Sequence, residues 1–317
     1  MLLLAPLLAV GQDLHFSQLD INPVLLNPSY VGFFDGSGRL GIIYRNQWAS
    51  VSHPYQTLAA TGEISLLRNR YKRYGLNAGI FAYSDKAGTL GYGTKMASVT
   101  ASFFHSLNGK NNNYLSVGLE AGYAISGYDP TNAESLDNGE QYNKTSTNYF
   151  LLGAGLAWFY QPNNQLILRT GLSVRNINRP NISYLKLDNT HLEPKLNGYV
   201  RIEHRTFESV SLLPVAAMQW QNGNKEILYG IDAKWYVNEA PQQLFALSAG
   251  VLMRHGDALV MTLQAEYNAL LVALSYDANI SHLATASHTL GAFELSVLYR
   301  FIRHKTNRRK AIPCPVM

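Results

Sequence analysis

The chain has 317 residues, of which 15% are charged and 11% are aromatic. Soluble domains carry roughly 25% charged residues, so this composition argues against an ordinary soluble surface. The formal net charge of +5 comes from the C-terminal tail, which carries five basic residues and no acidic one: Arg303, Lys305, Arg308, Arg309 and Lys310. The body of the chain is therefore about neutral, which argues against a nucleic-acid-binding face.

Residues 1–11, MLLLAPLLAVG, form an apolar run that is too short to span a bilayer and ends in small residues. This pattern is typical of a signal peptide cleaved near Gly11, although the usual basic region at its start is missing. We therefore predict that the protein is exported. The alternative is that the apolar run is an N-terminal strand of the core. The single cysteine, Cys314, has no partner for an internal disulfide.

Residues 12–38 contain two Asn-Pro pairs, Asn22-Pro23 and Asn27-Pro28. Proline fixes φ, lacks an N–H donor and pushes the preceding residue away from helix. The sequence therefore predicts that residues 12–38 form an extended segment with two turns, and not a strand of a sheet. We call this segment the strip. Apolar side chains such as Phe16 and Tyr30 would be costly to leave in water, so we expect the strip to pack against the rest of the protein.

From Arg39 to Phe301 the sequence alternates between two unlike faces with a period of two, which is typical of β-strands. We expect about fourteen strands, at 39–48, 55–66, 74–84, 95–106, 113–124, 148–160, 165–175, 196–205, 209–221, 225–237, 244–254, 258–267, 270–277 and 290–301. Most contain about ten residues, the length that crosses an outer membrane in a tilted strand. The sequence predicts an all-β fold, a transmembrane antiparallel barrel over residues 39–301.

The connections between these strands alternate in length. The long ones, 85–94, 125–147, 176–195 and 278–289, all fall at odd positions along the chain. Bacterial barrels have short periplasmic turns and longer outer loops, so this alternation supports a barrel with both chain ends in the periplasm. The basic tail, 302–317, would then be periplasmic and could meet anionic lipid or machinery proteins.

Charged residues within the strands should face the lumen, because Lys or Arg facing lipid at the midplane costs about 2 to 4 kcal/mol. These residues are Arg201, Glu203, Asp232, Lys234, Arg254, Glu266 and Arg300. A barrel of this size is too wide for wall side chains alone to fill. We predict that the strip packs on the periplasmic mouth or enters the lumen as a partial plug.

We predict no catalytic residue, cofactor or metal, and a protein that is not an enzyme. His255, His282 and His288 lie in or beside turns without a nucleophile motif. The segment Asp137–Asn143 carries acid and amide oxygens, but its spacing is not that of an EF-hand Ca²⁺ loop.

Two segments combine loop-forming and apolar residues, 176–187 and 276–301, as a loop that grips a partner would. An ordinary outer loop is the alternative for both. With the strip, they supply the candidate partner-binding or plug residues: Phe16, Asn22, Pro23, Asn27, Pro28, Tyr30, Asn176, Asn178, Arg179, Pro180, Asn279 and His282.

Several motifs together resemble one family. In order they are QDLHFSQLDINPVLLNPSYVG, YRNQW, DKAGTLGYGT, NINRPN, YDANISHLATASHTLGAFELSVLYRF and a final CP. The series resembles the PorP/SprF outer-membrane proteins of the type IX secretion system of Bacteroidetes. The resemblance covers the chain after the leader almost end to end.

This resemblance implies a non-enzymatic barrel that docks, exports or anchors a cell-surface partner such as an adhesin. The implied partners are outer-membrane lipid, a type IX secreted protein bound through its C-terminal domain, and periplasmic lipoproteins of the secretion machinery. A passive outer-membrane pore or small-solute transporter is the alternative function, because it shares the fold and explains lumenal charges equally well. A secreted soluble β-sandwich or propeller adhesin is a third reading, against which the low charge content argues.

Overall fold

The computed structural model describes residues 16–19, 21–47, 54–68, 73–88, 91–128, 146–184, 190–240, 243–280 and 290–302. The predicted leader, the segment Asp137–Asn143, His282, His288 and the tail after residue 302 lie outside these residues. Within the described part, no helix has the length and apolar character needed to cross a bilayer.

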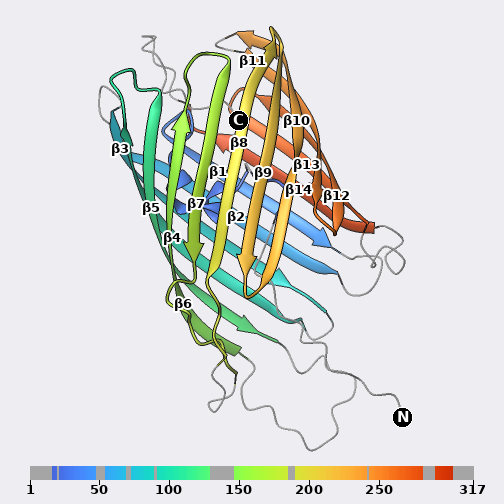
Figure 1. Cartoon of the computed structure of the whole chain (residues 1–317). Helices are drawn as coiled ribbons and strands as arrows, with labels where there is room; N and C mark the ends of the chain where they lie inside the picture. Colours follow the sequence, from blue (N-terminus) through green and yellow to red (C-terminus); the bar gives the residue numbers. More distant parts are fainter. Residues whose placement is uncertain are drawn as a thin grey trace, which may run out of the picture.

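Fourteen antiparallel strands form one closed barrel (Figure 1). Each strand pairs with its neighbours in the sequence, and β1 pairs with β14 to close the sheet. This confirms the predicted architecture. The strands are β1 (Gly38–Gln47), β2 (Tyr55–Arg68), β3 (Tyr74–Lys86), β4 (Gly93–Ser106), β5 (Asn113–Gly127), β6 (Ser146–Tyr160), β7 (Leu166–Arg175), β8 (Lys195–Phe207), β9 (Val210–Gln221), β10 (Asn224–Ala240), β11 (Gln243–Arg254), β12 (Ala258–Tyr267), β13 (Leu270–Asn279) and β14 (Leu290–Arg300).

The longest connections all lie at one end of the barrel. They are 128–145 between β5 and β6, 176–194 between β7 and β8, and 280–289 between β13 and β14. At the opposite end the connections are short, for example 208–209, 241–242 and 268–269. We call these the long-loop end and the short-turn end. The alternation read from the sequence is therefore present in the fold.

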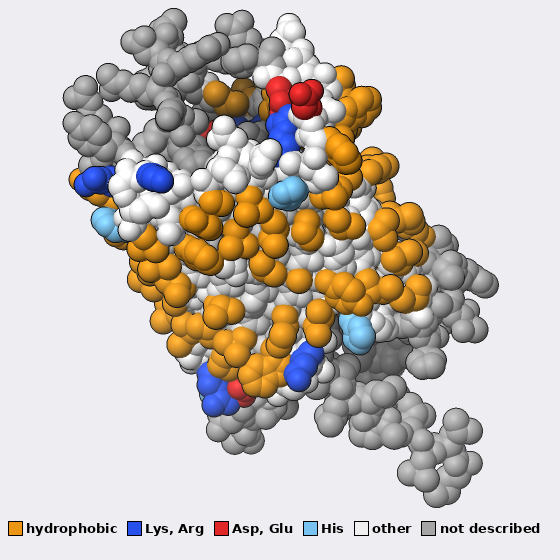
Figure 2. All heavy atoms as spheres, turned by 45° about the horizontal axis from the view of Figure 1, so that its top comes forward, with side chains coloured by type: hydrophobic (Ala, Val, Ile, Leu, Met, Phe, Trp, Pro, Cys, Tyr) orange, Lys and Arg blue, Asp and Glu red, His pale blue; other side chains and the backbone are white. Residues whose placement is uncertain are grey.

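The outer face of the barrel wall is apolar, as contact with lipid requires, and the inner face carries buried charged residues. Figure 2 shows hydrophobic side chains gathered in a band across the visible face of the barrel, with charged side chains toward its two ends. Outward residues such as Leu119 and Leu172 are 68% and 69% exposed. All seven charged residues expected to face the lumen are buried, which confirms that prediction.

The strip contains two helical turns, α1 (Pro23–Leu26) and η1 (Pro28–Tyr30). Asn22 and Asn27, which precede the prolines, have non-helical dihedral angles, as expected. The two expected turns are present, but they are helical where an extended backbone was expected. Proline is well suited to the first position of a helical turn, where its missing N–H is not needed, and here each proline begins such a turn.

Residues 16–19 and 21–37 run through the inside of the barrel from one end to the other. Ser17 hydrogen-bonds to Asp277 near the long-loop end of β13, and the Ser37 N–H donates to the Phe301 carbonyl at the short-turn end, 2.9 Å away. The first described residues therefore lie at the opposite end from Phe301. The expectation that both chain ends lie in the periplasm concerns residues before Phe16 and after Ile302, which lie outside the described part of the chain.

Candidate functional site

The interface between the strip and the lumen wall is the candidate functional site, and Asn27 is its central anchor. The Asn27 Nδ2 donates to the Leu156 carbonyl on β6 at 3.0 Å and to the Leu172 carbonyl on β7 at 3.1 Å. Its Oδ1 accepts from the Ser29 N–H at 2.9 Å, which caps η1. One buried amide therefore fixes both the local turn and its position on the wall.

Serines on the wall hold the backbone of the strip. The hydroxyls of Ser102, Ser116 and Ser173 donate to the carbonyls of Val31, Ser29 and Leu26 at 2.7, 2.7 and 2.5 Å. These serines come from β4, β5 and β7. They satisfy strip carbonyls that would otherwise be buried without partners, which matters because such groups cost about 1 to 3 kcal/mol each.

Glycines on the inner wall give the strip room to approach. A Cβ at Gly118 of β5 would overlap the backbone of Pro28 and Ser29. A Cβ at Gly155 of β6 would overlap the Asn27 side chain. Both positions therefore accept only glycine at this separation of strip and wall.

Aromatic rings fill the short-turn half of the lumen around the strip. Phe33 stacks on Phe159 with ring centroids 3.6 Å apart, and Tyr30 meets Phe159 and Tyr199 edge-on at 5.5 and 5.7 Å. Tyr30 and Phe33 are 4% and 7% exposed. Three cavities beside the strip have volumes of about 20, 10 and 10 Å³, each room for about one water molecule.

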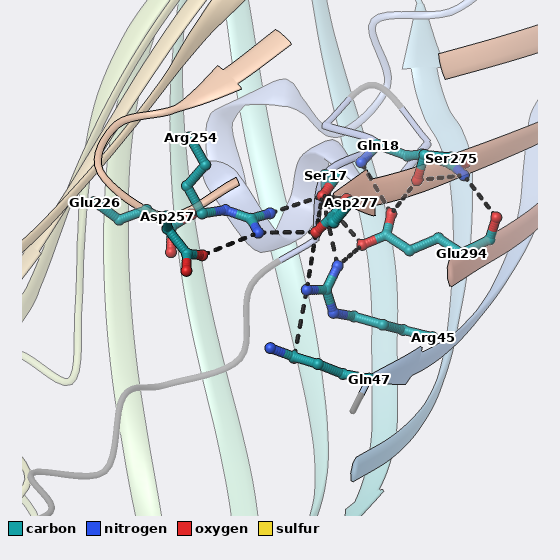
Figure 3. Close-up of polar contacts among 10 residues, drawn as sticks. All are labelled: Ser17, Gln18, Arg45, Gln47, Glu226, Arg254, Asp257, Ser275, Asp277 and Glu294. Atoms are coloured by element: carbon teal, nitrogen blue, oxygen red, sulfur yellow. Dashed lines mark hydrogen bonds and ion pairs between the residues drawn. The ribbon is translucent and has the colours of Figure 1, made fainter. Parts of the chain in front are cut away.

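A charged cluster holds the other end of the strip, toward the long loops (Figure 3). The Ser17 Oγ donates to Asp277 at 2.8 Å and accepts from Arg254 at 2.7 Å. The N–H groups of Ser17 and Gln18 donate to the two carboxylate oxygens of Glu294 at 2.8 and 3.1 Å. Both carboxylates are thus shared between the strip and the wall.

Two arginines neutralise these carboxylates. Arg45 of β1 pairs with Glu294 and, at 3.2 Å, with Asp277, while Arg254 of β11 pairs with Asp277 at 2.8 Å. The side chains of all four residues are 4% exposed or less. Buried charges are tolerated only when paired and hydrogen-bonded, so the cluster depends on every member.

Further ion pairs between neighbouring or next-nearest strands extend around the inner wall. They are Arg39–Glu63, Arg175–Glu120, Arg201–Asp232, Lys234–Glu266 and Arg300–Glu266. All are buried. The lumen is therefore lined by paired charges. Among the described residues, no group of three His, Cys, Asp or Glu side chains is arranged to hold a metal ion.

The candidate residues from the sequence fall into separate places. Phe16, Asn22, Pro23, Asn27, Pro28 and Tyr30 lie together inside the lumen. The Asn22 amide is buried and makes no hydrogen bond to the described residues, unlike that of Asn27. Asn279 lies at the long-loop end of β13 and is buried, while His282 is outside the described residues.

The remaining candidates, Asn176, Asn178, Arg179 and Pro180, begin the long connection after β7. Asn176 and Arg179 adopt positive φ values of 57° and 45°. Arg179 pairs with Glu193 at 2.5 Å in an exposed ion pair, and the Pro180 carbonyl accepts from the Leu192 N–H at 2.9 Å. These contacts order the base of the connection, away from the strip.

Sequence reasoning missed the partners that the wall supplies, Arg45, Asp277, Gly118 and Gly155 among them. A partial signal was present, since Glu294 occurs on the polar face of its strand. Nothing in the sequence states which polar residue on one strand meets which residue of the strip, because those contacts join positions up to 277 residues apart.

A closed barrel with an apolar outer band and a polar, filled lumen defines an outer-membrane protein. The family model described as type IX secretion system membrane protein PorP/SprF matches residues 9–299. The chain therefore belongs to the PorP/SprF family and is an outer-membrane component of the type IX secretion system. No curated protein matches the chain.

Solved structures with the same fold are outer-membrane barrels of low sequence identity. A Pseudomonas aeruginosa FadL homologue is 12% identical with a TM-score of 0.53, covering 87% of this chain and 93% of its own. The Pseudomonas putida toluene transporter TodX is 9% identical with a TM-score of 0.52, covering 88% and 92%. The monoaromatic hydrocarbon channel CymD is 12% identical with a TM-score of 0.51, covering 90% and 94%. At these identities the likeness concerns the fold alone.

Proposed function

We propose that this barrel docks or anchors a cell-surface protein exported by the type IX secretion system, and that it acts as a closed barrel without enzymatic activity. The observation that carries the proposal is the strip. Residues 16–19 and 21–37 follow the lumen over its length, and their anchors at Ser17 and Asn27 are 1% exposed. A lumen filled in this way supports a docking role over conduction.

We also propose where each partner binds. The long connections share one end, so we propose that the exported protein binds there through its C-terminal domain, as an adhesin would. The tail after residue 302 continues from the short-turn end, and its basic residues suit anionic lipid or lipoproteins of the machinery. The barrel would thus connect an outer partner to the periplasmic side.

Deletion of the gene in the native bacterium tests this role. Surface proteins would be labelled on intact cells with a membrane-impermeant biotin reagent and compared between the deletion strain and a complemented strain. We expect at least one large surface protein to disappear from the deletion strain and return on complementation. An unchanged set of surface proteins would contradict the proposal.

The alternative is a passive pore or small-solute transporter, and the fold shared with the hydrocarbon channel CymD and the transporter TodX is what favours it. Conductance of the purified barrel in planar bilayers separates the two functions. We expect no steady current, because the strip and its aromatic cluster obstruct the lumen. A steady open current from the unmodified protein would favour the pore.

A further inference from the structure

Strand β6 extends past its neighbour β7 at the long-loop end. It pairs with β5 along its whole length, from Ser146↔Gly127 to Tyr160↔Asn113. Its pairing with β7 begins only at Gly153, opposite Arg175. Residues 146–152 therefore form the side of a hairpin that projects beyond the tip of β7, and Figure 1 shows the same projection.

Just past the end of β7, residues 177 and 178 extend the pairing with β6 a short way further. The Ile177 N–H donates to the Leu152 carbonyl at 3.1 Å, and the Leu152 N–H donates to the Asn178 Oδ1 at 3.0 Å. The Asn178 Nδ2 then donates to the Phe150 carbonyl at 2.8 Å. These contacts place the backbone groups of even-numbered residues on the edge away from β5.

The next groups on that edge are the N–H of Phe150 and the N–H and C=O of Asn148. They make no hydrogen bond to any residue that the structure describes. Natural proteins protect exposed edges with charges, proline or a bulge. Residues 146–150, STNYF, contain no charge or proline, and their pairing with β5 is regular.

The side chains around the edge are uncharged and aromatic. Phe150 points outward and is 69% exposed, with its ring 5.0 Å from that of Tyr123. Lipid chains offer no hydrogen-bonding group to an open edge, which costs several kcal/mol per unpaired group in hydrocarbon. The edge therefore suits an extended polypeptide with apolar side chains more than it suits lipid.

We propose that the edge of β6 at Asn148–Phe150 binds an extended, uncharged segment of the exported surface protein as an added β-strand. This mode of recognition uses backbone hydrogen bonds for affinity and side-chain contacts for selectivity. The inference rests on the proposed docking function and specifies its contact surface. The added strand occupies the position that β7 would fill if it were longer, with Asn178 marking where the pairing begins.

Two substitutions at one position test the edge. Asn148→Pro removes the free N–H without removing any bond of the barrel ladder, because this N–H faces away from β5. Asn148→Val keeps the N–H and, like the proline variant, loses the bond from the Asn148 Nδ2 to the Tyr123 hydroxyl. We expect Asn148→Pro to lower the amount of surface-retained partner by about tenfold and Asn148→Val to leave it within about twofold.

The readout is biotin labelling of intact cells, for the surface protein that the deletion strain loses, with barrel folding checked by heat-dependent gel mobility. If the deletion removes a surface protein but Asn148→Pro retains it, the edge proposal is wrong and docking stands. If Asn148→Pro does not fold, Asn148→Lys replaces it, since a charged residue also blocks strand addition. If the deletion changes no surface protein, both proposals fail.

A photoreactive phenylalanine analogue at position 150 tests the occupant directly. We expect irradiation of living cells to cross-link it to a peptide of the same surface protein, identified by mass spectrometry. The same analogue at Leu172, which is also 69% exposed but lies on the paired part of the wall, should not cross-link to that protein. Cross-linking of position 150 to a second copy of this chain, or to lipid alone, would overturn the proposal.

Discussion

The two asparagines that precede prolines in the strip have the same local sequence but different surroundings. Asn27 makes hydrogen bonds to two strands and to its own turn. Asn22 is 3% exposed, and its amide has no partner among the described residues. A repeated motif therefore contributes a wall anchor only where the inner wall presents carbonyls to it.

We predict that Asn27→Ala destabilises the barrel by about 1 to 3 kcal/mol, because it leaves buried strip and wall groups without partners. Asn22→Ala is the matched control and should cost less, since no such bond is lost. Urea unfolding in detergent, followed by tryptophan fluorescence, measures both. Equal destabilisation by the two variants would show that the Asn27 bonds do not anchor the strip.

At the scale of elements, glycines on the inner faces of β5 and β6 decide how closely the strip approaches. Gly118 faces the strip backbone, which cannot move aside as a flexible side chain could. In contrast, Gly109 lies in a short turn where an added Cβ meets nothing within 4 Å. The same residue type thus serves close packing at one position and a turn at the other.

We predict that Gly118→Ala displaces the strip from β5 and costs about 1 to 3 kcal/mol of stability, as overpacking of a filled interior does. Thiol labelling at Ser29→Cys, in a Cys314→Ser background, reports the displacement, because Ser29 is fully buried. Labelling should be faster in Gly118→Ala than in the Gly109→Ala control. Equally slow labelling would mean that the strip keeps its place.

The charged cluster at the long-loop end is the second contact between elements that holds the strip. Glu294 accepts from Ser17 and Gln18 of the strip and pairs with Arg45 of β1. The pair Arg179–Glu193 offers a contrast, because Arg179 is 57% exposed and Glu193 31%. Burial makes the first pair costly to break and solvent makes the second one weak.

We predict that Glu294→Gln destabilises the barrel by about 3 to 5 kcal/mol, because Arg45 is then buried with less compensating charge. Glu193→Gln should cost about 1 kcal/mol or less. Unfolding midpoints in urea compare the two variants. A second readout is bilayer conductance, in which Glu294→Gln should show intermittent current as the end of the strip comes loose. Identical midpoints would argue against a structural role for the cluster.

The strands themselves were largely predictable at this scale. Apolar and polar residues alternate in segments such as Leu259–Tyr267 because each strand faces lipid on one side and a polar lumen on the other. Two turns at Pro23 and Pro28 were predicted, but their helical conformation was not, since proline is compatible with both an extended segment and the start of a helix.

For the whole molecule, the direction of the strip through the lumen is the feature with the widest consequence. Ser17 lies toward the long-loop end and Ser37 at the short-turn end, beside Phe301. The chain that precedes the strip therefore joins it at the end where the partner is proposed to bind.

We predict that an epitope inserted between Gln12 and Asp13 is accessible on the side of the membrane that carries the long loops. An epitope after Met317 should be accessible on the opposite side. Antibody binding to intact and permeabilised cells measures both, with an epitope in the turn at Gly256 marking the long-loop side. If both terminal epitopes were accessible only after permeabilisation, the strip would not pass through the lumen as described.

The sequence by itself determined the architecture, because alternation, strand length and loop parity are local properties that each strand carries alone. It also determined the family, through motifs spread from Gln12 to Phe301. Only the tertiary structure decided what lies inside the lumen, which residues anchor it and which strand edge has no pairing partner among the described residues. These depend on pairings between distant residues, such as Ser17 with Glu294 and Asn27 with Leu156, and on the unequal heights of β6 and β7 in a closed sheet.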